Sequence, residues 1–230
     1  EEDEALKSVA EETENQIRKI AYQTPSYTVE NGTTLLDTPE GPMPIEVFGA
    51  HNLSNLAGAK WLCQCMGVDE AEFYEAIASF KGASKRLEKI AESTSKVAYK
   101  DFAHSPSKVS ATTKAVKAQY PDRKVVACLE LHTYSSLNAE FLKEYQGALD
   151  AADVAVVFYS PDAVKIKRLE EVTYDQIAQS FQREDLIIYT NPTEFKDFLF
   201  SQNLENSALL LMSSGNYGGL NFDEVKGLIN

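Results

Sequence analysis

The sequence predicts an α/β protein in two parts, divided as residues 1–93 and 94–230. In the second part, strand-like and helix-like segments alternate, which is typical of βαβ units. Several of its strand-like runs are continuously apolar, "KVVACLEL" among them, as buried parallel strands are. We therefore expect a Rossmann-like domain with a mostly parallel sheet and helices on both faces. The first part combines turn signals with two helical patterns and predicts a smaller α+β region.

The elements of the first part follow from its periodicity and its turn residues. Residues 1–20 are acidic, with apolar residues at helical spacing, and predict an amphipathic helix. "ENG" and "TPEGP" mark turns between two or three short antiparallel strands in residues 27–48. Two helices are expected over about 53–66 and 69–80, with Asp69 as the N-cap of the second.

The second part begins after "AESTSK", residues 91–96, which we interpret as a linker and a domain boundary. Pro106 is expected to start the first helix, where its missing N–H costs nothing. The predicted strands are "VAYKDF", "KVVACLEL", "ADVAVVFYS", "DLIIYT" and "SALLLMSSG". The predicted helices are "SPSKVSATTKAVKAQY", "NAEFLKEYQGAL", "TYDQIAQSF", "TEFKDFLFSQ" and "NFDEVKGLI".

Composition narrows the function classes. The formal net charge of −13 argues against a nucleic-acid surface or an anionic membrane as the main partner. Cys63, Cys65 and Cys128 show neither disulfide nor zinc spacing, so we expect buried thiols in a reducing compartment. No run approaches the roughly 18 apolar residues of a membrane span. The start, "EEDEALKSVA", is neither a signal peptide nor an initiator methionine, so we expect a cytoplasmic chain whose beginning is a cut.

Unusual residues follow the predicted strands, where ligands bind in open α/β sheets. Asp101 and His104 follow the first strand, and Glu130, His132 and Tyr134 follow the second. The glycine turn "SSGNYGG" follows the last strand. Structural explanations stay open: Asp101 as a helix cap, His104 as a hydrogen-bonding residue at a helix start, His132 as exposed loop, and the glycine turn as a plain turn.

Two further groups fit a nucleotide. Lys85 and Arg86 are adjacent cations in "FKGASKRLE" and could offset the charge of a phosphoryl group in transfer. Asn52 and Asn55, beside His51, are three residues apart on one helix face and could pair with an adenine edge. The alternatives are that the two cations are simply solvated at the surface and that Asn52 caps the helix.

Three motifs in this order resemble the Mur ligases, the ATP-dependent amide-bond-forming family of peptidoglycan synthesis. They are G-x-H-N-x-x-N at residues 49–55, G-x-x-x-R-x-E at 82–88 and D-[YF]-[AG]-H-x-P at 101–106. The resemblance covers nearly the whole chain. "FGAHNLSNLAGAKW" and "KDFAHSPSKV" most resemble the branch that acts on UDP-N-acetylmuramate, which includes the L-alanine ligase and the murein peptide ligase; we favour the latter.

The resemblance implies a role for each candidate residue. Those placed near the nucleotide are His51, Asn52 and Asn55 at adenine, Asp101 at the ribose, and His104 in the adjoining loop. Lys85 and Arg86 are implied to act catalytically, on ATP phosphates or the acyl-phosphate intermediate. The loop that faces the incoming amino acid or peptide contains the substrate-binding candidates Glu130, His132, Tyr134, Ser135 and Ser136.

The implied reaction phosphorylates a carboxylate with ATP, after which an amine attacks the acyl phosphate. The implied partners are ATP with Mg²⁺, UDP-N-acetylmuramate, and L-alanine or murein tripeptide, with neither nucleic acid nor membrane involved. ATP and Mg²⁺ are expected to bind mainly to central-domain segments that find no match here.

The chain departs from the family pattern at several points. It has no G-x-x-x-x-G-K-[ST] segment, no match to the family's magnesium-binding glutamate or modified lysine, and no UDP-binding domain. We therefore expect the end of a central ATPase domain plus a full C-terminal domain, inactive alone. Thr133, Ser135 and Ser136 stand where alanine-adding relatives often carry arginines. A non-catalytic nucleotide- or peptide-binding module and a folylpolyglutamate synthase-like ligase are the alternatives.

Overall fold

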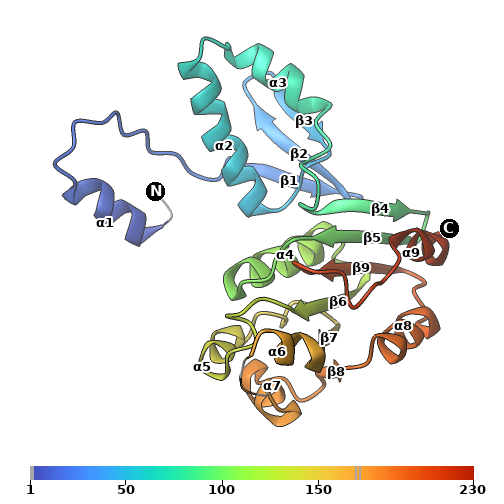
Figure 1. Ribbon diagram of the computed structural model, residues 1–230. Coiled ribbons are helices and arrows are strands. Elements are labelled where there is room, and N and C mark those ends of the chain that lie inside the picture. Colours follow the sequence, from blue (N-terminus) through green and yellow to red (C-terminus); the bar gives the residue numbers. More distant parts are fainter. Residues whose placement is uncertain (1–2, 169, 171) are drawn as a thin grey trace. The chain divides into compact units, whose positions relative to one another are not determined.

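The structure is a computed structural model that describes residues 3–168, 170 and 172–230 (Figure 1). The chain divides into two compact units, Glu1–Lys81 and Gly82–Asn230. The division lies before the boundary that we expect near residue 93. β4 (Glu88–Glu92) runs antiparallel to β5 (Lys96–Asp101) in the second unit. "AESTSK" is not a linker, because Ala91 and Glu92 belong to β4, Lys96 begins β5, and residues 93–95 form the turn between these paired strands.

The first unit contains a three-stranded antiparallel sheet, as the turn signals predict. Its strands are β1 (Tyr27–Glu30), β2 (Thr33–Thr38) and β3 (Gly41–Ile45), in the order β1-β2-β3. Asn31 and Gly32 both have positive φ, 51° and 77°, which suits the tight turn of a two-residue hairpin. The sheet thus forms from sequence-local pairings.

Two helices complete the first unit. They are α2 (Ala50–Cys65) and α3 (Glu70–Ala78), and Asp69 caps α3 in a reciprocal capping box with Glu72. Leu36 and Ile45 from the sheet share a core with Leu53, Leu56 and Phe73 from the helices.

The first helix is shorter than its periodicity predicts. α1 covers Glu4–Glu12 only, and residues 13–26 are not helical. No residue of α1 is buried, and Leu6 and Val9 are 67% and 64% exposed. Because tertiary packing supplies most of a helix's stability in proteins, a helix without a packed face has little to extend it.

The second unit is a six-stranded sheet in the order β4-β5-β9-β6-β7-β8, parallel except for β4. This confirms the predicted mostly parallel α/β architecture. Its further strands are β6 (Lys124–Leu131), β7 (Val154–Tyr159), β8 (Ile187–Tyr189) and β9 (Ser207–Met212). Its helices are α4 (Pro106–Gln119), α5 (Ala139–Leu142), the 3-10 turn η1 (Lys143–Tyr145), α6 (Pro161–Ile166), α7 (Tyr174–Phe181), α8 (Pro192–Ser201) and α9 (Phe222–Ile229).

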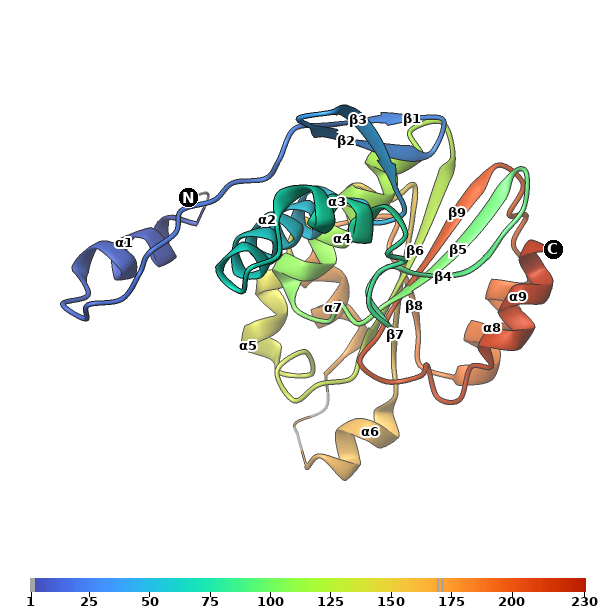
Figure 2. The same cartoon turned by 90° about the horizontal axis from the view of Figure 1, so that it is seen from above.

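Helices cover both faces of this sheet. Figure 2 shows α4, α5 and α7 on one face and α8 and α9 on the other. All six residues of β9 are buried, as its continuously apolar run "SALLLM" predicts. Phe195 and Tyr217 stack beside Phe158 in the core on the side of α8.

Two helical predictions need correction. "NAEFLKEYQGAL" is not one helix: α5 gives way to η1, and Gly147 turns the chain with a φ of 72°. The sequence reading also missed α6, although Ser160 accepts a hydrogen bond from the Ala163 N–H as its N-cap and Pro161 is its first residue.

All three cysteines are free, but the expectation that all are buried is wrong for Cys65. Cys128 lies in β6 with no exposed surface, and burial raises the pKa of its thiol to about 12. Cys63 is half-buried, and Cys65 is exposed in the last turn of α2. The described part of the chain contains no helix that is both long and apolar enough to cross a membrane.

Asp153 fixes the turn before β7 and yields a pH-dependent prediction. Its Oδ2 accepts from the Val125 N–H at 2.7 Å and from Lys117 Nζ at 2.9 Å. Burial alone raises the pKa of this carboxyl, but these two hydrogen bonds outweigh burial and hold the pKa below its usual 3.8. The stabilisation is therefore present above the unfolded-state pKa and is lost as pH falls through the folded-state pKa.

We expect Asp153→Asn to lower the free energy of unfolding at pH 7 by about 1 kcal/mol, because the ion pair is partly exposed. The difference between variant and wild type should shrink below pH 3.8. Urea unfolding followed by circular dichroism at several pH values measures this. Asp162→Asn, at a side chain 86% exposed, is the control. A difference that persists at the lowest pH would contradict the assignment.

Candidate active-site edge of the second unit

The placement of β9 between β5 and β6 creates the candidate site. Asp101 and Met212, the last residues of β5 and β9, lie level with Leu129, and β6 continues to Leu131. The chain leaves β5 and β6 toward α4 and α5 on one face, and leaves β9 toward α9 on the other (Figure 2). Such a divergence opens a crevice at the carboxyl edge of a parallel sheet, where ligands bind in open α/β proteins.

Asp101 links the segment at Leu87 to the loop that follows β5, two segments that belong to different sequence motifs. Its carboxylate accepts from the Leu87 N–H at 2.7 Å on Oδ2 and from the Ala103 N–H at 2.6 Å on Oδ1. The Phe102 N–H also donates to the Lys85 carbonyl at 2.9 Å. Asp101 is 7% exposed and does not cap α4, whose N-cap Ser105 makes no side-chain capping bond. It therefore anchors the loop of residues 84–88, named the cationic loop from here on.

The cationic loop has an unusual backbone. Lys85 and Leu87 have φ of 56° and 43°, a region that non-glycine residues rarely occupy. Glu88 accepts from the Lys85 N–H at 2.8 Å and pairs with Lys100 at 2.9 Å. Burial alone raises the pKa of Glu88, yet these partners outweigh it and lower the pKa below the usual value. Strained backbone that is held by several bonds is typical of functional loops.

The cationic loop, held by these hydrogen bonds, carries two exposed cationic side chains. Lys85 and Arg86 are both exposed, and the Arg86 guanidinium lies 5.7 Å from the centroid of the Phe102 ring. A cation over an aromatic face is weakly attracted and held in place. The G-x-x-x-R-x-E and D-F-A-H-x-P segments therefore form one continuous surface in the second unit.

His104 is oriented by its own loop. Its Nδ1 lies 2.8 Å from the Phe102 carbonyl oxygen, and its ring meets the Phe102 ring edge-to-face at 5.1 Å. Because a carbonyl only accepts, Nδ1 is the nitrogen that donates to it, which in a neutral ring leaves Nε2 as the acceptor. The His104 carbonyl in turn accepts from the Tyr145 hydroxyl, and burial raises the pKa of Tyr145.

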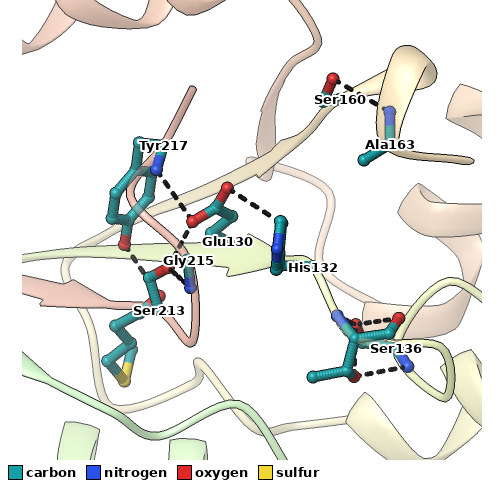
Figure 3. A network of polar contacts seen from close by, with 10 residues as sticks. Glu130, His132, Ser136, Ser160, Ala163, Ser213, Gly215 and Tyr217 are labelled. Atoms are coloured by element: carbon teal, nitrogen blue, oxygen red, sulfur yellow. Dashed lines mark hydrogen bonds and ion pairs between the residues drawn. The ribbon is translucent and has the colours of Figure 1, made fainter. Parts of the chain in front are cut away.

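A second network joins the ends of β6 and β9, as Figure 3 shows. Glu130 is 3% exposed, and its Oε2 accepts from the Ser213 hydroxyl and from the Tyr217 N–H at 2.9 Å. Its Oε1 lies 3.6 Å from Nδ1 of His132. The Tyr217 hydroxyl donates to the Cys128 and Met212 carbonyls, at 2.7 and 2.8 Å. The "SSGNYGG" turn is thus tied to the neighbouring strand.

The loop after His132 is mostly self-contained. The Ser136 hydroxyl, in a residue 1% exposed, accepts from the Thr133 N–H at 2.9 Å and serves the turn rather than the surface (Figure 3). Ser135 and Tyr134 are exposed, and Tyr134 is 64% exposed. Lys167, which follows α6, lies 4.8 Å from the centroid of the Tyr134 ring. It adds a cation beside this loop that the sequence reading missed together with α6.

A groove of about 590 Å³ opens next to His104. It lies between the start of α4 and the η1 region, and its walls are formed by Ser105, Pro106, Ser107, Ser110, Phe141, Glu144, Gln146 and Ala148. Hydroxyl groups, one aromatic ring and one carboxylate make it suitable for a polar ligand of peptide size.

The adenine candidates lie in the first unit, at the start of α2. Gly49, at φ 89°, is its N-cap, so Asn52 does not cap the helix. The Asn52 side-chain amide donates to the Phe48 carbonyl at 3.0 Å, whereas Asn55 is exposed one turn later. His51 is half-buried. The helix thus brings His51, Asn52 and Asn55 together at one end.

The structure brings the candidates of the second unit to one sheet edge, at the ends of β5, β6 and β9 and in the cationic loop. Tyr217 and Tyr145 are the buried residues that the sequence reading missed; the position of Tyr217 inside "SSGNYGG" was the available signal. Among the described residues, no cluster of three or more His, Cys, Asp or Glu side chains could hold a metal ion.

Comparison with known proteins identifies the family, although no family model matches the chain. UDP-N-acetylmuramate–L-alanine ligase from Gloeothece citriformis is 33% identical over 184 residues, which are 76% of this chain and 36% of that protein. The chain belongs to the Mur ligase family. It spans less than half the length of each of eight curated relatives that it matches, between 19% and 48%.

Solved structures show the same Mur ligase fold. UDP-N-acetylmuramate–alanine ligase from Thermotoga maritima matches with a TM-score of 0.65 and 16% identity, over 88% of this chain and 44% of its own. A murein peptide ligase from Psychrobacter arcticus matches with 0.57 and 19%, over 86% and 42%. A folylpolyglutamate synthase from Thermotoga maritima matches with 0.51 and 15%, over 83% and 43%. At these identities the likeness concerns the fold.

Asp101→Asn should loosen the cationic loop. Both oxygens of Asp101 accept from backbone N–H groups, and an asparagine must turn its NH₂ group toward one of those donors. We expect a loss of about 1.5–3 kcal/mol in local stability, the range for hydrogen bonds to a charged group. Hydrogen exchange at the Leu87 and Ala103 amides should accelerate. Asp122→Asn, at an exposed residue, is the control. Unchanged exchange at both amides would refute the anchoring role.

Proposed function

We propose that this chain is the C-terminal part of an ATP-dependent Mur ligase that joins an amino acid or peptide to UDP-N-acetylmuramate through an acyl phosphate. One observation carries the proposal. The Asp101 carboxylate accepts a hydrogen bond from the Leu87 N–H of the cationic loop, so the G-x-x-x-R-x-E and D-F-A-H-x-P motifs form one surface on which Lys85 and Arg86 are exposed. A charged, strained and anchored loop suits the stabilisation of a transferring phosphoryl group.

We propose the nucleotide roles on the basis of the family resemblance. Lys85 and Arg86 are proposed to meet ATP phosphates or the acyl phosphate, and Asp101 to accept from the ribose with the lone pairs that its two backbone donors leave. His51, Asn52 and Asn55 are proposed to recognise adenine. His104, held by the Phe102 carbonyl, orders the loop beside the nucleotide. Mg²⁺ is proposed to bind mainly outside this chain, where it would neutralise phosphate charge.

The amine substrate that we favour is the murein tripeptide rather than L-alanine. The loop after β6 carries Thr133, Ser135 and Ser136 where alanine-adding relatives often carry arginines, and Thr133 and Ser136 bond to each other. The 590 Å³ groove beside His104 offers room that L-alanine alone does not need. Lys167 beside Tyr134 could meet one of the carboxylates that a longer peptide carries.

Arg86→Ala, made in the full-length protein, should lower kcat/KM on the order of 10²-fold, because one preorganised charge contact to the transferring group is lost. Steady-state phosphate release with ATP, UDP-N-acetylmuramate and the amine measures the effect. Lys165→Ala, at a side chain 74% exposed, is the matched control. Wild-type kcat/KM in Arg86→Ala would remove the phosphate role.

A panel of amines decides the substrate. We expect the full-length protein to prefer L-alanyl-γ-D-glutamyl-meso-diaminopimelate over L-alanine in kcat/KM. Preference for L-alanine would overturn the tripeptide assignment. Turnover with a folate and glutamate instead would favour the folylpolyglutamate synthase alternative, and nucleotide binding without any turnover would favour a binding module. The 230-residue chain alone should release no phosphate, since it contains no G-x-x-x-x-G-K-[ST] segment.

A further inference from the structure

A buried carboxylate and an accessible imidazole face each other at the end of β6. Glu130 is 3% exposed, the His132 side chain is 41% exposed, and Oε1 lies 3.6 Å from Nδ1. The two residues are separated by one position in an extended segment, so their side chains leave the backbone on the same side. The pair therefore has one solvent-shielded member and one member that a ligand can reach.

The carboxylate is held so that it cannot turn away from the imidazole. Its Oε2 accepts from the Ser213 hydroxyl and the Tyr217 N–H, and the Ser213 hydroxyl accepts from the Gly215 N–H at 2.6 Å. Gly215 packs against the pair so closely that an added Cβ would lie 2.8 Å from Oε2 and 3.0 Å from Cγ of His132. Oε1 is the oxygen left for His132, as Figure 3 shows.

This arrangement selects one tautomer of His132. A carboxylate only accepts, so the hydrogen of the neutral imidazole belongs on Nδ1, and Nε2 keeps its lone pair. Within the described residues, no hydrogen bond engages Nε2. The separation of 3.6 Å is longer than a hydrogen bond, but catalytic hydrogen bonds are often long before the substrate binds.

We propose that His132 accepts the proton of the incoming ammonium group and that Glu130 is the residue that positions it. The inference rests on the ligase function proposed above, because an amine must lose a proton before it can attack an acyl phosphate. His104 is the less suitable base, since its Nδ1 faces a neutral carbonyl. A carboxylate stabilises the imidazolium that forms, which a carbonyl does less well.

Amide formation moves two protons from the nitrogen of the incoming ammonium group. The ammonium group gives one proton to Nε2, leaving a neutral amine and an imidazolium whose Nδ1–H faces Glu130. The amine nitrogen forms a bond to the acyl carbon, and the bond from that carbon to the phosphate oxygen breaks, with the electron pair leaving on phosphate. The second proton of the nitrogen goes to the departing phosphate, giving the amide and hydrogen phosphate.

The tautomer of His132 can be observed directly, because the chain contains three histidines. We expect nitrogen NMR of the ¹⁵N-histidine-labelled chain, at a pH where imidazole is neutral, to show hydrogen on Nδ1 of His132. Glu130→Gln should move it to Nε2: the glutamine oxygen can still accept from Ser213 and Tyr217, while its NH₂ group faces Nδ1. His104 is the internal control and should not change. An identical His132 spectrum in both proteins would overturn the positioning role, as would an imidazolium in both.

The catalytic half is tested in the full-length protein. We expect His132→Gln and Glu130→Gln to lower the rate of amide formation on the order of 10²-fold, while amine-independent formation of the acyl phosphate stays at the wild-type rate. Gly215→Ala, which pushes into the pair without removing either member, should do the same. Its φ is not in the left-handed region, so alanine strains the contact rather than the backbone.

The outcomes separate the two proposals. If no acyl phosphate forms in the wild type, the ligase proposal fails. If acyl phosphate forms and the His132→Gln protein joins the amine at the wild-type rate, the proton-acceptor proposal alone fails. Because His132 is 41% exposed, its glutamine variant should fold even if Glu130→Gln does not.

Discussion

The position of β9 between β5 and β6 is the constraint on which the site depends. Its six buried residues pair in parallel on both sides, and the Ser213 N–H donates to the Asp101 carbonyl just beyond the pairing. Three loops thereby end at one edge of the sheet. Without this insertion, Glu130 would have neither the Ser213 hydroxyl nor the Tyr217 N–H as partners, and a buried carboxylate without donors is costly.

Two buried carboxylates serve the site in different ways. Both carboxylate oxygens of Asp101 accept hydrogen bonds from backbone N–H groups, which fixes the shape of the cationic loop. Oε2 of Glu130 accepts from the glycine turn, whereas Oε1 faces the imidazole of His132, which can carry a proton. The first arrangement holds the loop that carries Lys85 and Arg86, and the second orients the imidazole of His132. Both arrangements are formed by the chain alone, and preorganisation of this kind is what the proposed phosphoryl transfer and amine attack require.

Much of this could be predicted from the sequence, where local signals are strong. The hairpin at Asn31, the cap at Asp69 and the apolar strands were visible as turn chemistry, capping and periodicity. The position of the unit boundary could not be predicted, because β4 belongs to the second unit only through its pairing with β5. The Asp101–Leu87 bond was equally hidden, since nothing local to either residue reveals a partner that tertiary folding supplies. Residue types thus indicated the site, whereas its internal bonding required the fold.

Among the strands that the structure describes, the one that completes the candidate site comes last in the sequence. During synthesis, β5 and β6 leave the ribosome before residues 207–217, which must then enter between them. Pairings between β5 and β9 join residues about a hundred positions apart, as Lys96 with Ser207, and such long-range closures are slow to form. Until then two strands present unpaired edges, which are prone to mispairing. The candidate site is therefore assembled only after β9 has entered the sheet.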